Sequence, residues 1–312
     1  MIRPRRCAIW LWVRLNRYRH LVAFGVLAAL LAACSPLSVL NASVPADGYT
    51  VATDIAFGGG ARQRLDLYLP TDPASNGTVV VFFYGGSWKR GDRADYRFMG
   101  EAFASQGYIT VVPDYRLYPE VGFPAFVQDG ADAVGWVHRT IALHGGNPDR
   151  IVLAGHSAGA HIAALLALDR RYLRDVEVPA SAIKGLIGLA GPYAFDPRRY
   201  RSTRPIFADA ADPFDTRPIN FVRPDAPPAL LLHGQADTVV RPANSQSLAL
   251  ALRSSGIAAR YAPLSDTGHV RILLNFAAPF RDGESPLSQA VDFIEQLPPD
   301  TAALQASDGD AD

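Results

Sequence analysis

Apolar and polar positions follow two patterns along this chain. Short runs of β-branched, aliphatic and aromatic residues are typical of buried strands, and longer stretches with apolar residues at helical spacing are typical of packed helices. The expected strands are Thr50–Phe57, Arg64–Tyr68, Thr78–Phe83, Tyr108–Val112, Ile151–Ala154, Gly185–Leu189, Ala229–Leu232 and Ala259–Leu264. The expected helices are Asp95–Ser105, Phe126–Leu143, Ala158–Leu168, Ala243–Ser254 and Pro286–Gln296.

The order of these elements predicts an α/β fold. Strands that alternate with helices imply parallel pairing through crossover helices, whereas the first two strands are close enough in sequence to form a hairpin. One segment, Gly191–Arg223, breaks the alternation because it is rich in proline, arginine and aromatic residues and has little apolar periodicity. We expect a mostly parallel central sheet flanked by helices.

The N-terminal segment differs from the rest in charge and hydropathy. Residues 1–33 contain six arginines and no acidic residue, and they end in the apolar run Leu21–Ala33. A basic region followed by a short apolar run is typical of an export signal, and this run is shorter than the roughly 20 residues of a transmembrane helix. The sequence Leu-Ala-Ala-Cys that ends at Cys34 resembles the bacterial lipobox, which predicts lipidation of Cys34 and a membrane anchor; an ordinary cleaved signal is the alternative.

These features divide the chain into four parts. We expect a signal at 1–33, a tether at 34–49, one catalytic domain at 50–298 and a disordered acidic tail at 299–312. Removal of the signal leaves 24 basic and 30 acidic residues, which argues against a nucleic-acid partner. It also removes Cys7, so that Cys34 is the only cysteine left and neither a disulfide nor a thiolate metal site is expected in the domain.

Candidate chemistry centres on Gly-His-Ser-Ala-Gly at 155–159, which lies between a predicted strand and a predicted helix. This is the G-x-S-x-G pattern of a nucleophile elbow, in which Ser157 is raised above the sheet on a sharp turn. A serine hydroxyl is a weak nucleophile and needs an adjacent base. The pattern alone recurs by chance, so the rest of the chain has to supply that base.

The other parts of such a site follow in order. Tyr84-Gly85-Gly86-Ser87-Trp88 comes after a predicted strand, where the backbone N–H groups of Gly85 and Gly86, with that of Ala158, would form an oxyanion hole. Asp237 comes after another strand and His269 after the last one. The chain order of Ser157, Asp237 and His269 is that of α/β-hydrolases.

The chain contains other acidic residues and histidines that could take these roles. Asp266 and Asp225 are alternatives to Asp237 for the acid. His156 and His161 lie too close to Ser157 in sequence to face its hydroxyl across a cleft, and His161 is expected to pack locally. Asp114 is expected to be a structural acid paired with Arg116.

The chain resembles the α/β-hydrolase esterases, in the branch that includes kynurenine formamidases, isoprenylcysteine methylesterases and hormone-sensitive-lipase-like carboxylesterases. The resemblance rests on YGGSW at 84–88, PDYRLYPE at 113–120, GGNPDRI at 145–151, GHSAGAHIAA at 155–164 and HGQAD at 233–237 together with His269. Tyr84 stands where the lipase-like members usually have the histidine of His-Gly-Gly-Gly, which favours the formamidase and methylesterase side.

The resemblance implies a serine carboxylic-ester hydrolase that uses no metal or cofactor. Ser157 would be the nucleophile, His269 the base and Asp237 the acid that orients it. Residues 191–223 would form a small lid or pocket wall. Tyr84, Trp88 and Tyr193 would be the aromatic residues of the pocket, and Trp88 is expected to support the oxyanion loop more than to bind substrate. The expected substrates are small or short-acyl esters, whereas formamide or amide hydrolysis, or a catalytically silent ligand-binding lipoprotein, are the alternatives.

Overall fold

The computed structural model describes residues 36–281 and 283–298. It divides the chain into a small N-terminal unit that ends at Ala42 and a compact body that begins at Ser43. The described part of the first unit is helix α2 (Pro36–Ala42), a regular element where only a tether was expected. The predicted signal at 1–33, Cys34 and the predicted tail at 299–312 lie outside the described residues. Within them, no helix has the length and apolar character to cross a membrane.

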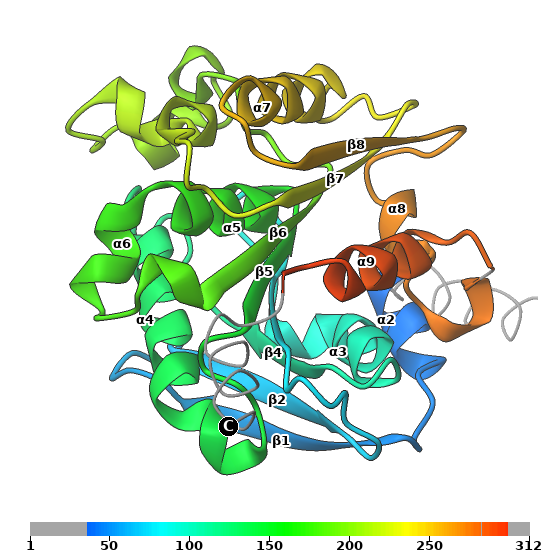
Figure 1. Cartoon of the computed structure of the whole chain (residues 1–312). Coiled ribbons are helices and arrows are strands. Elements are labelled where there is room, and N and C mark those ends of the chain that lie inside the picture. Colours follow the sequence, from blue (N-terminus) through cyan, green and yellow to red (C-terminus); the bar gives the residue numbers. More distant parts are fainter. Residues whose placement is uncertain (1–35, 282, 299–312) are drawn as a thin grey trace, which may run out of the picture. The chain divides into compact units, whose positions relative to one another are not determined.

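The body is built on one eight-stranded sheet with the strand order β1-β2-β4-β3-β5-β6-β7-β8 (Figure 1). Strands β1 and β2 form the expected antiparallel hairpin, β2 pairs antiparallel with β4, and all pairs from β4 onward are parallel. The strands are β1 (Tyr49–Ala56), β2 (Arg64–Pro70), β3 (Val79–Phe83), β4 (Ile109–Pro113), β5 (Ile151–His156), β6 (Ile183–Leu189), β7 (Ala229–Gly234) and β8 (Ala259–Leu264). The predicted α/β architecture with a mostly parallel sheet is confirmed.

The central strands are apolar throughout because both of their faces are covered. Every residue of β3 and of β5 is buried. Strands covered by helices on both faces lose the polar alternation of half-exposed strands, which is why these two appear in the sequence as continuous apolar runs.

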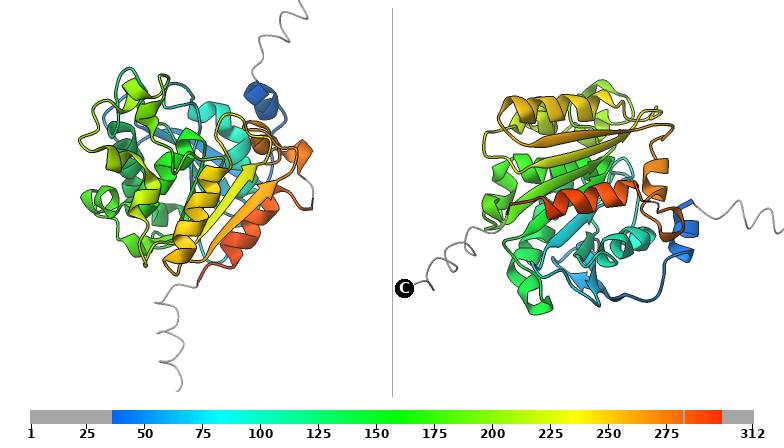
Figure 2. Two further views of the ribbon diagram at one scale, coloured as in Figure 1. Left: turned by 90° about the horizontal axis from the view of Figure 1, so that it is seen from above. Right: turned by 45° about the vertical axis from the view of Figure 1, so that its right-hand side comes forward.

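Helices cover the two faces of the sheet. Helices α3 (Arg97–Ala104) and α9 (Pro286–Glu295) lie on one face, and α4 (Ala125–Thr140), α5 (Ala158–Leu168) and α7 (Ala243–Ser254) lie on the other (Figure 2). Helix α5 is buried along its whole length, as an all-apolar sequence requires. The short helices α6 (Arg170–Asp175) and α8 (Arg271–Leu274) were not predicted, because one or two turns carry no measurable period.

The segment that broke the alternation, 191–223, folds as a series of single 3₁₀ turns. These are η4 (Pro197–Arg199), η5 (Arg204–Phe207), η6 (Pro213–Thr216) and η7 (Pro218–Phe221). Each has a proline in its first two positions, where the missing N–H removes no hydrogen bond.

Candidate active site

Ser157 occupies a sharp turn between β5 and α5. Its backbone angles are φ 53° and ψ −117°. Residues other than glycine rarely adopt a positive φ. The turn needs the flanking glycines, because a Cβ on Gly155 would lie 2.5 Å from the carbonyl carbon of Gly159, and one on Gly159 would lie 2.0 Å from the carbonyl oxygen of Phe83. The local geometry is therefore that of the predicted nucleophile elbow.

The structure brings Ser157, His269 and Asp237 together although 112 residues separate the serine from the histidine. The Oγ of Ser157 lies 2.8 Å from Nε2 of His269. The Nδ1 of the same histidine lies 2.7 Å from a carboxylate oxygen of Asp237. This arrangement allows the hydroxyl proton to pass to Nε2 while Nδ1–H is held by the carboxylate.

Asp237 is buried and hydrogen bonded on both oxygens. One oxygen accepts the backbone N–H groups of Val239 and Val240, at 2.8 and 2.9 Å. The other contacts His269 and also Nε2 of His233, 3.2 Å away. Burial alone would raise the pKa of Asp237, but the hydrogen bonds from His233, His269 and Val240 hold that pKa well below its usual range. The carboxylate is therefore ionised throughout the physiological range.

His233, at the end of β7, supports the carboxylate of Asp237. Its position at the end of a predicted strand did not indicate this role. Its Nδ1 lies 2.7 Å from the hydroxyl of Ser245, and its Nε2 lies 2.8 Å from the carbonyl oxygen of Val240. Because Nε2 faces two acceptors, the Val240 carbonyl and the Asp237 carboxylate, it carries a proton. The sequence signal that could have indicated this contact is the four-residue spacing of histidine and aspartate in His-Gly-Gln-Ala-Asp at 233–237.

The alternative acids lie elsewhere. Asp225 forms ion pairs with Arg170 and Arg223. Asp266 is exposed on the turn after β8, and its carboxylate makes no contact with His269 among the described residues. The geometry thus favours Asp237.

The two histidines near Ser157 in sequence face away from its hydroxyl, as expected. Nε2 of His156 lies 2.9 Å from the carbonyl oxygen of His269, so it helps to hold the loop that carries His269. Nε2 of His161 lies 2.9 Å from the carbonyl oxygen of Thr216, and the ring packs edge-on against Trp88. Burial lowers the pKa of His156 to about 3 and that of His161 to about 4, so both rings are neutral.

The glycine loop after β3 crosses directly over the elbow. A Cβ on Gly85 would lie 2.7 Å from Nδ1 of His156 and 3.1 Å from Cβ of Ser157, so the loop can approach this closely only with glycine there. The N–H groups of Gly86, Ser87 and Ala158 donate no hydrogen bond to any described residue. Of the loop, Ser87 and Trp88 line the cavity, whereas Gly85 and Gly86 do not. Ser87 was not singled out from the sequence.

Tyr84 is not a pocket aromatic. Its side chain is fully buried, stacked between Tyr96 and Tyr115 with ring centroids 5.2 and 4.8 Å away. Its hydroxyl donates to Asp114 at 2.6 Å and accepts from Arg62 at 2.8 Å. These contacts pull the ring behind the glycine loop, where it anchors the loop to the sheet.

Two further expectations are corrected by the packing. Tyr193 is fully buried and does not line the cavity; it lies so close to the end of β6 that a Cβ on Gly188 would lie 1.9 Å from its hydroxyl oxygen. Asp114 is a structural acid, but its partners are Tyr84, Arg62 and Arg93. Arg116 pairs instead with the buried Asp129, at 2.8 Å.

A cavity of about 360 Å³ opens beside Ser157. It is within the size range of small-molecule sites. Trp88, Phe195 and Tyr200 supply aromatic surface, and Trp88 also packs edge-on against Phe207 of the 191–223 segment. The other lining residues come from the glycine loop, the 191–223 segment, the residues after Asp237 and the start of α7. Several of them carry hydroxyl or amide groups: Ser87, Ser202, Thr203, Thr238 and Asn244.

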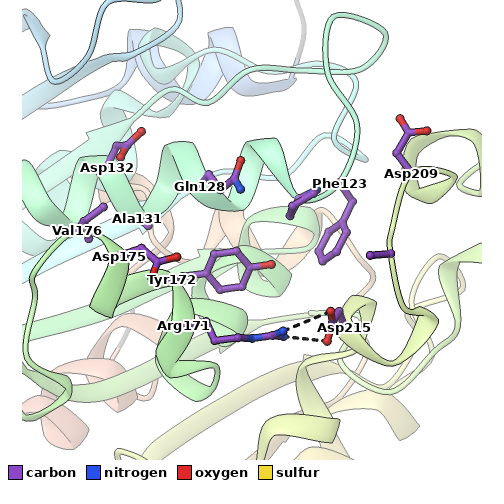
Figure 3. A pocket seen from close by; sticks show the side chains of 12 residues that line it. Phe123, Gln128, Ala131, Asp132, Arg171, Tyr172, Asp175, Val176, Asp209 and Asp215 are labelled. Carbon is purple, nitrogen blue, oxygen red and sulfur yellow. Dashed lines mark hydrogen bonds and ion pairs between the residues drawn. The ribbon is translucent and has the colours of Figure 1, made fainter.

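A second cavity, of about 380 Å³, lies between α4, α6 and residues 209–215 (Figure 3). Phe123 and Tyr172 face it, and Arg171 crosses it to an ion pair with Asp215. Ser157, His269 and Asp237 do not line this cavity, whereas Ser157 lines the first one.

The sheet order and the elbow define an α/β-hydrolase fold. Solved structures with the same fold include a truncated carbohydrate esterase from gut microbiota, at a TM-score of 0.67 and 21% identity over 81% of this chain and 98% of that one. A thermophilic esterase of Thermogutta terrifontis with propionate bound is similar at a TM-score of 0.66 and 25% identity, over 80% of this chain and 95% of that one.

The chain belongs to the BD-FAE family, whose profile matches residues 65–252. Its curated relatives include a probable isoprenylcysteine α-carbonyl methylesterase of Oryza sativa, 30% identical over 81% of this chain and 64% of the relative. Esterase LipQ of Mycobacterium tuberculosis is 31% identical over 70% of this chain and 56% of its own length. The chain thus spans only 56% to 64% of the length of these two relatives, and 36% of another methylesterase from Oryza sativa. The family resemblance inferred from the sequence is confirmed.

Proposed function

We propose that this protein is a serine carboxylic-ester hydrolase. The observation that carries the proposal is the unbroken hydrogen-bonded path from Ser157 through His269 to Asp237, placed at a cavity wide enough for a small ester. Relatives and structural neighbours with esterase names support the same reaction class.

In the proposed mechanism, His269 takes the proton of Ser157 as the oxygen attacks the substrate carbonyl. Asp237 keeps the imidazole in the tautomer with Nδ1 protonated and stabilises the imidazolium that forms. The free N–H groups of Gly86, Ser87 and Ala158 would stabilise the oxyanion, at about 3 kcal/mol for one such donor. Gly85 permits the close approach of the loop. The imidazolium of His269 then gives its proton to the departing alcohol, which breaks the ester bond and leaves the acyl group on Ser157. In the second half His269 takes a proton from water, which attacks the acyl-enzyme, and returns it to Ser157 as the carboxylic acid leaves.

We propose small or short-acyl esters as substrates. The wall segment consists of single turns, and its Pro192, Phe195 and Tyr200 border a cavity of modest volume. The similar Thermogutta esterase was solved with propionate bound.

The test combines covalent labelling with a substrate panel. Wild type should react with a fluorophosphonate probe at Ser157 and hydrolyse p-nitrophenyl esters, with kcat/KM highest from acetyl to butyryl and much lower by ten carbons. Ser157→Ala should lose both properties without a change in its melting curve. Absence of labelling would indicate a silent ligand-binding protein, a preference for N-formyl aryl amides would indicate a formamidase, and a long-chain optimum would contradict the short-acyl proposal.

We also propose that the protein is exported and anchored to a membrane by lipid at Cys34. The support is the basic, then apolar N-terminal sequence that ends in Leu-Ala-Ala-Cys. A stable anchor needs more than one acyl chain, which a lipobox cysteine would carry as a diacylglycerol and an N-acyl group. Wild type should fractionate with membranes, whereas Cys34→Ser should give an unprocessed or a soluble protein. A mature N-terminus without lipid, away from Cys34, as measured by mass spectrometry, would contradict the proposal.

A further inference from the structure

The cavity beside Ser157 has an unbalanced charge. Of the described residues that line it, Arg241 is the only charged one, and neither an aspartate nor a glutamate belongs to that lining. The second cavity is the opposite, since four aspartates line it with one arginine. Arg241 therefore brings a positive charge to the border of the first cavity, and no described carboxylate forms an ion pair with it.

The backbone of Arg241 is fixed while its guanidinium is free. Its carbonyl oxygen accepts the backbone N–H of Asn244 at 2.9 Å and the side-chain amide of Asn244 at 3.1 Å. The preceding residue, Val240, is hydrogen bonded to Asp237. Within the described part of the chain, the Arg241 side chain is exposed and its guanidinium forms no ion pair or hydrogen bond. A planar fork on a fixed backbone suits a carboxylate, which it binds with two parallel hydrogen bonds.

The segment that supplies part of the lining carries further positive charge. Residues 196–204, which supply Tyr200, Ser202 and Thr203 to the lining, contain four arginines and one aspartate. Lys89, from the oxyanion loop, donates to the carbonyl oxygen of Ser202 at 2.8 Å. The chain beyond residue 33 has more acidic than basic residues, so this wall is positive against a negative background. Positive charge on and next to the border of a cleft raises the local concentration of anionic ligands.

We propose that the substrates are esters that also carry a free carboxylate, and that Arg241 binds this carboxylate. The proposal rests on the proposed ester hydrolysis and names the substrate class of the same site. Arg241 is then a specificity residue, whereas bond cleavage stays with Ser157 and His269.

The test compares matched esters with and without a carboxylate, using the full chain. On the acyl side, mono-p-nitrophenyl glutarate is compared with p-nitrophenyl pentanoate; on the alcohol side, 4-acetoxybenzoate is compared with 4-acetoxybenzamide. Each kcat/KM is divided by the rate of alkaline hydrolysis of the same ester. We expect the anionic ester of at least one pair to be preferred about tenfold, mainly through a lower KM, and the preference to weaken from 20 to 500 mM salt (approximate concentrations) because exposed charges are screened.

Substitutions then assign the preference to Arg241. Arg241→Gln should remove the preference, and Arg241→Lys should retain part of it because the charge remains without the fork. Arg253→Gln is the matched control and should keep the wild-type ratio, because Arg253 is exposed in the last turn of helix α7, whereas Arg241 precedes the first turn.

Three outcomes would overturn the proposal. Equal normalised rates in both pairs, a preference that survives in Arg241→Gln, or one lost instead in Arg201→Gln would each exclude Arg241 as the carboxylate site. In all three cases neutral esters are still hydrolysed, so the proposed function stands. Failure to hydrolyse any ester would overturn the proposed function as well.

Discussion

At the scale of single residues, Asp237 has the most constrained environment in the site. It accepts hydrogen bonds from two backbone N–H groups and faces two histidines, one of which is the proposed base. Those contacts fix the position of the carboxylate and keep it ionised, and thereby fix the orientation and tautomer of His269.

Asp237→Asn should therefore reduce kcat by about 10⁴-fold, the size of the same change in a serine protease, because an amide favours the wrong histidine tautomer. Asp266→Asn, an exposed change three residues before His269, should have little effect. Steady-state kinetics with a short-chain ester measures both. A larger loss in Asp266→Asn would mean that the acid has been misassigned.

Sequence patterns could identify Ser157, Asp237 and His269 because each follows a strand and their chain order is diagnostic. The same patterns could not place Tyr84. Its neighbours along the chain are glycines, but its direction is set by Arg62 and Asp114, which come from other loops. The pocket aromatics depend on such long-range contacts, and Tyr84 and Tyr193 were wrongly expected in the cavity for that reason.

At the scale of elements, the glycine loop after β3 is held from behind by the next strand. The hydroxyl of Tyr115, just after β4, donates to the carbonyl oxygen of Tyr84 at 2.8 Å. Arg62 donates to the carbonyl oxygen of Gly91 at 2.6 Å, at the other end of the loop. The positions of the proposed oxyanion donors thus depend on contacts below them.

Tyr115→Phe should lower kcat by roughly tenfold with a smaller change in KM, because a displaced oxyanion loop weakens transition-state binding more than ground-state binding. Tyr172→Phe is a suitable control, since Tyr172 lines the second cavity. Loss of stability in proportion to the loss of kcat would indicate a purely structural role for Tyr115.

The helices and strands could be predicted only where the apolar residues repeat regularly or form a continuous run. Continuous apolar runs such as Val79–Phe83 and Ile151–His156 were located to within two residues, because burial on both faces leaves an unmistakable signal. The single 3₁₀ turns of 191–223 were recognised only as a break in the pattern. Their geometry is set by local prolines and side-chain caps, such as Asp196 and Asp212, which have no period.

At the scale of the whole molecule, buried neutral histidines should make the fold sensitive to acid. The pKa values of His156 and His161 are lowered to about 3 and 4 by burial, against about 6.5 in an unfolded chain. Between these values the unfolded chain binds protons that the folded chain does not. The stabilising contribution of the two neutral histidines is therefore fully present above about pH 6.5, and the free energy of unfolding falls as the pH drops from there towards 4.

His161→Gln should reduce this pH dependence, because an amide can still donate to the Thr216 carbonyl but does not titrate. Between about pH 7.5 and 4.5 the Tm of His161→Gln should fall less than the Tm of wild type. We expect the two decreases to differ by roughly 4 to 8 °C, which corresponds to about 2 kcal/mol in the free energy of unfolding. His138→Gln, on the partly exposed face of α4, is the matched control. Identical pH dependence in wild type and His161→Gln would contradict the assignment.

The backbone of Ser157 implies a conflict between catalysis and thermal resistance. A side chain at φ 53° and ψ −117° stores on the order of 1–3 kcal/mol, which glycine would release. Ser157→Gly loses the nucleophile, as Ser157→Ala does, but it should melt several degrees higher than Ser157→Ala, even after the greater entropy of its unfolded chain is counted. A screen for heat tolerance alone would thus favour glycine at this position and recover dead enzyme, so any effort to stabilise the protein has to select for turnover at the same time.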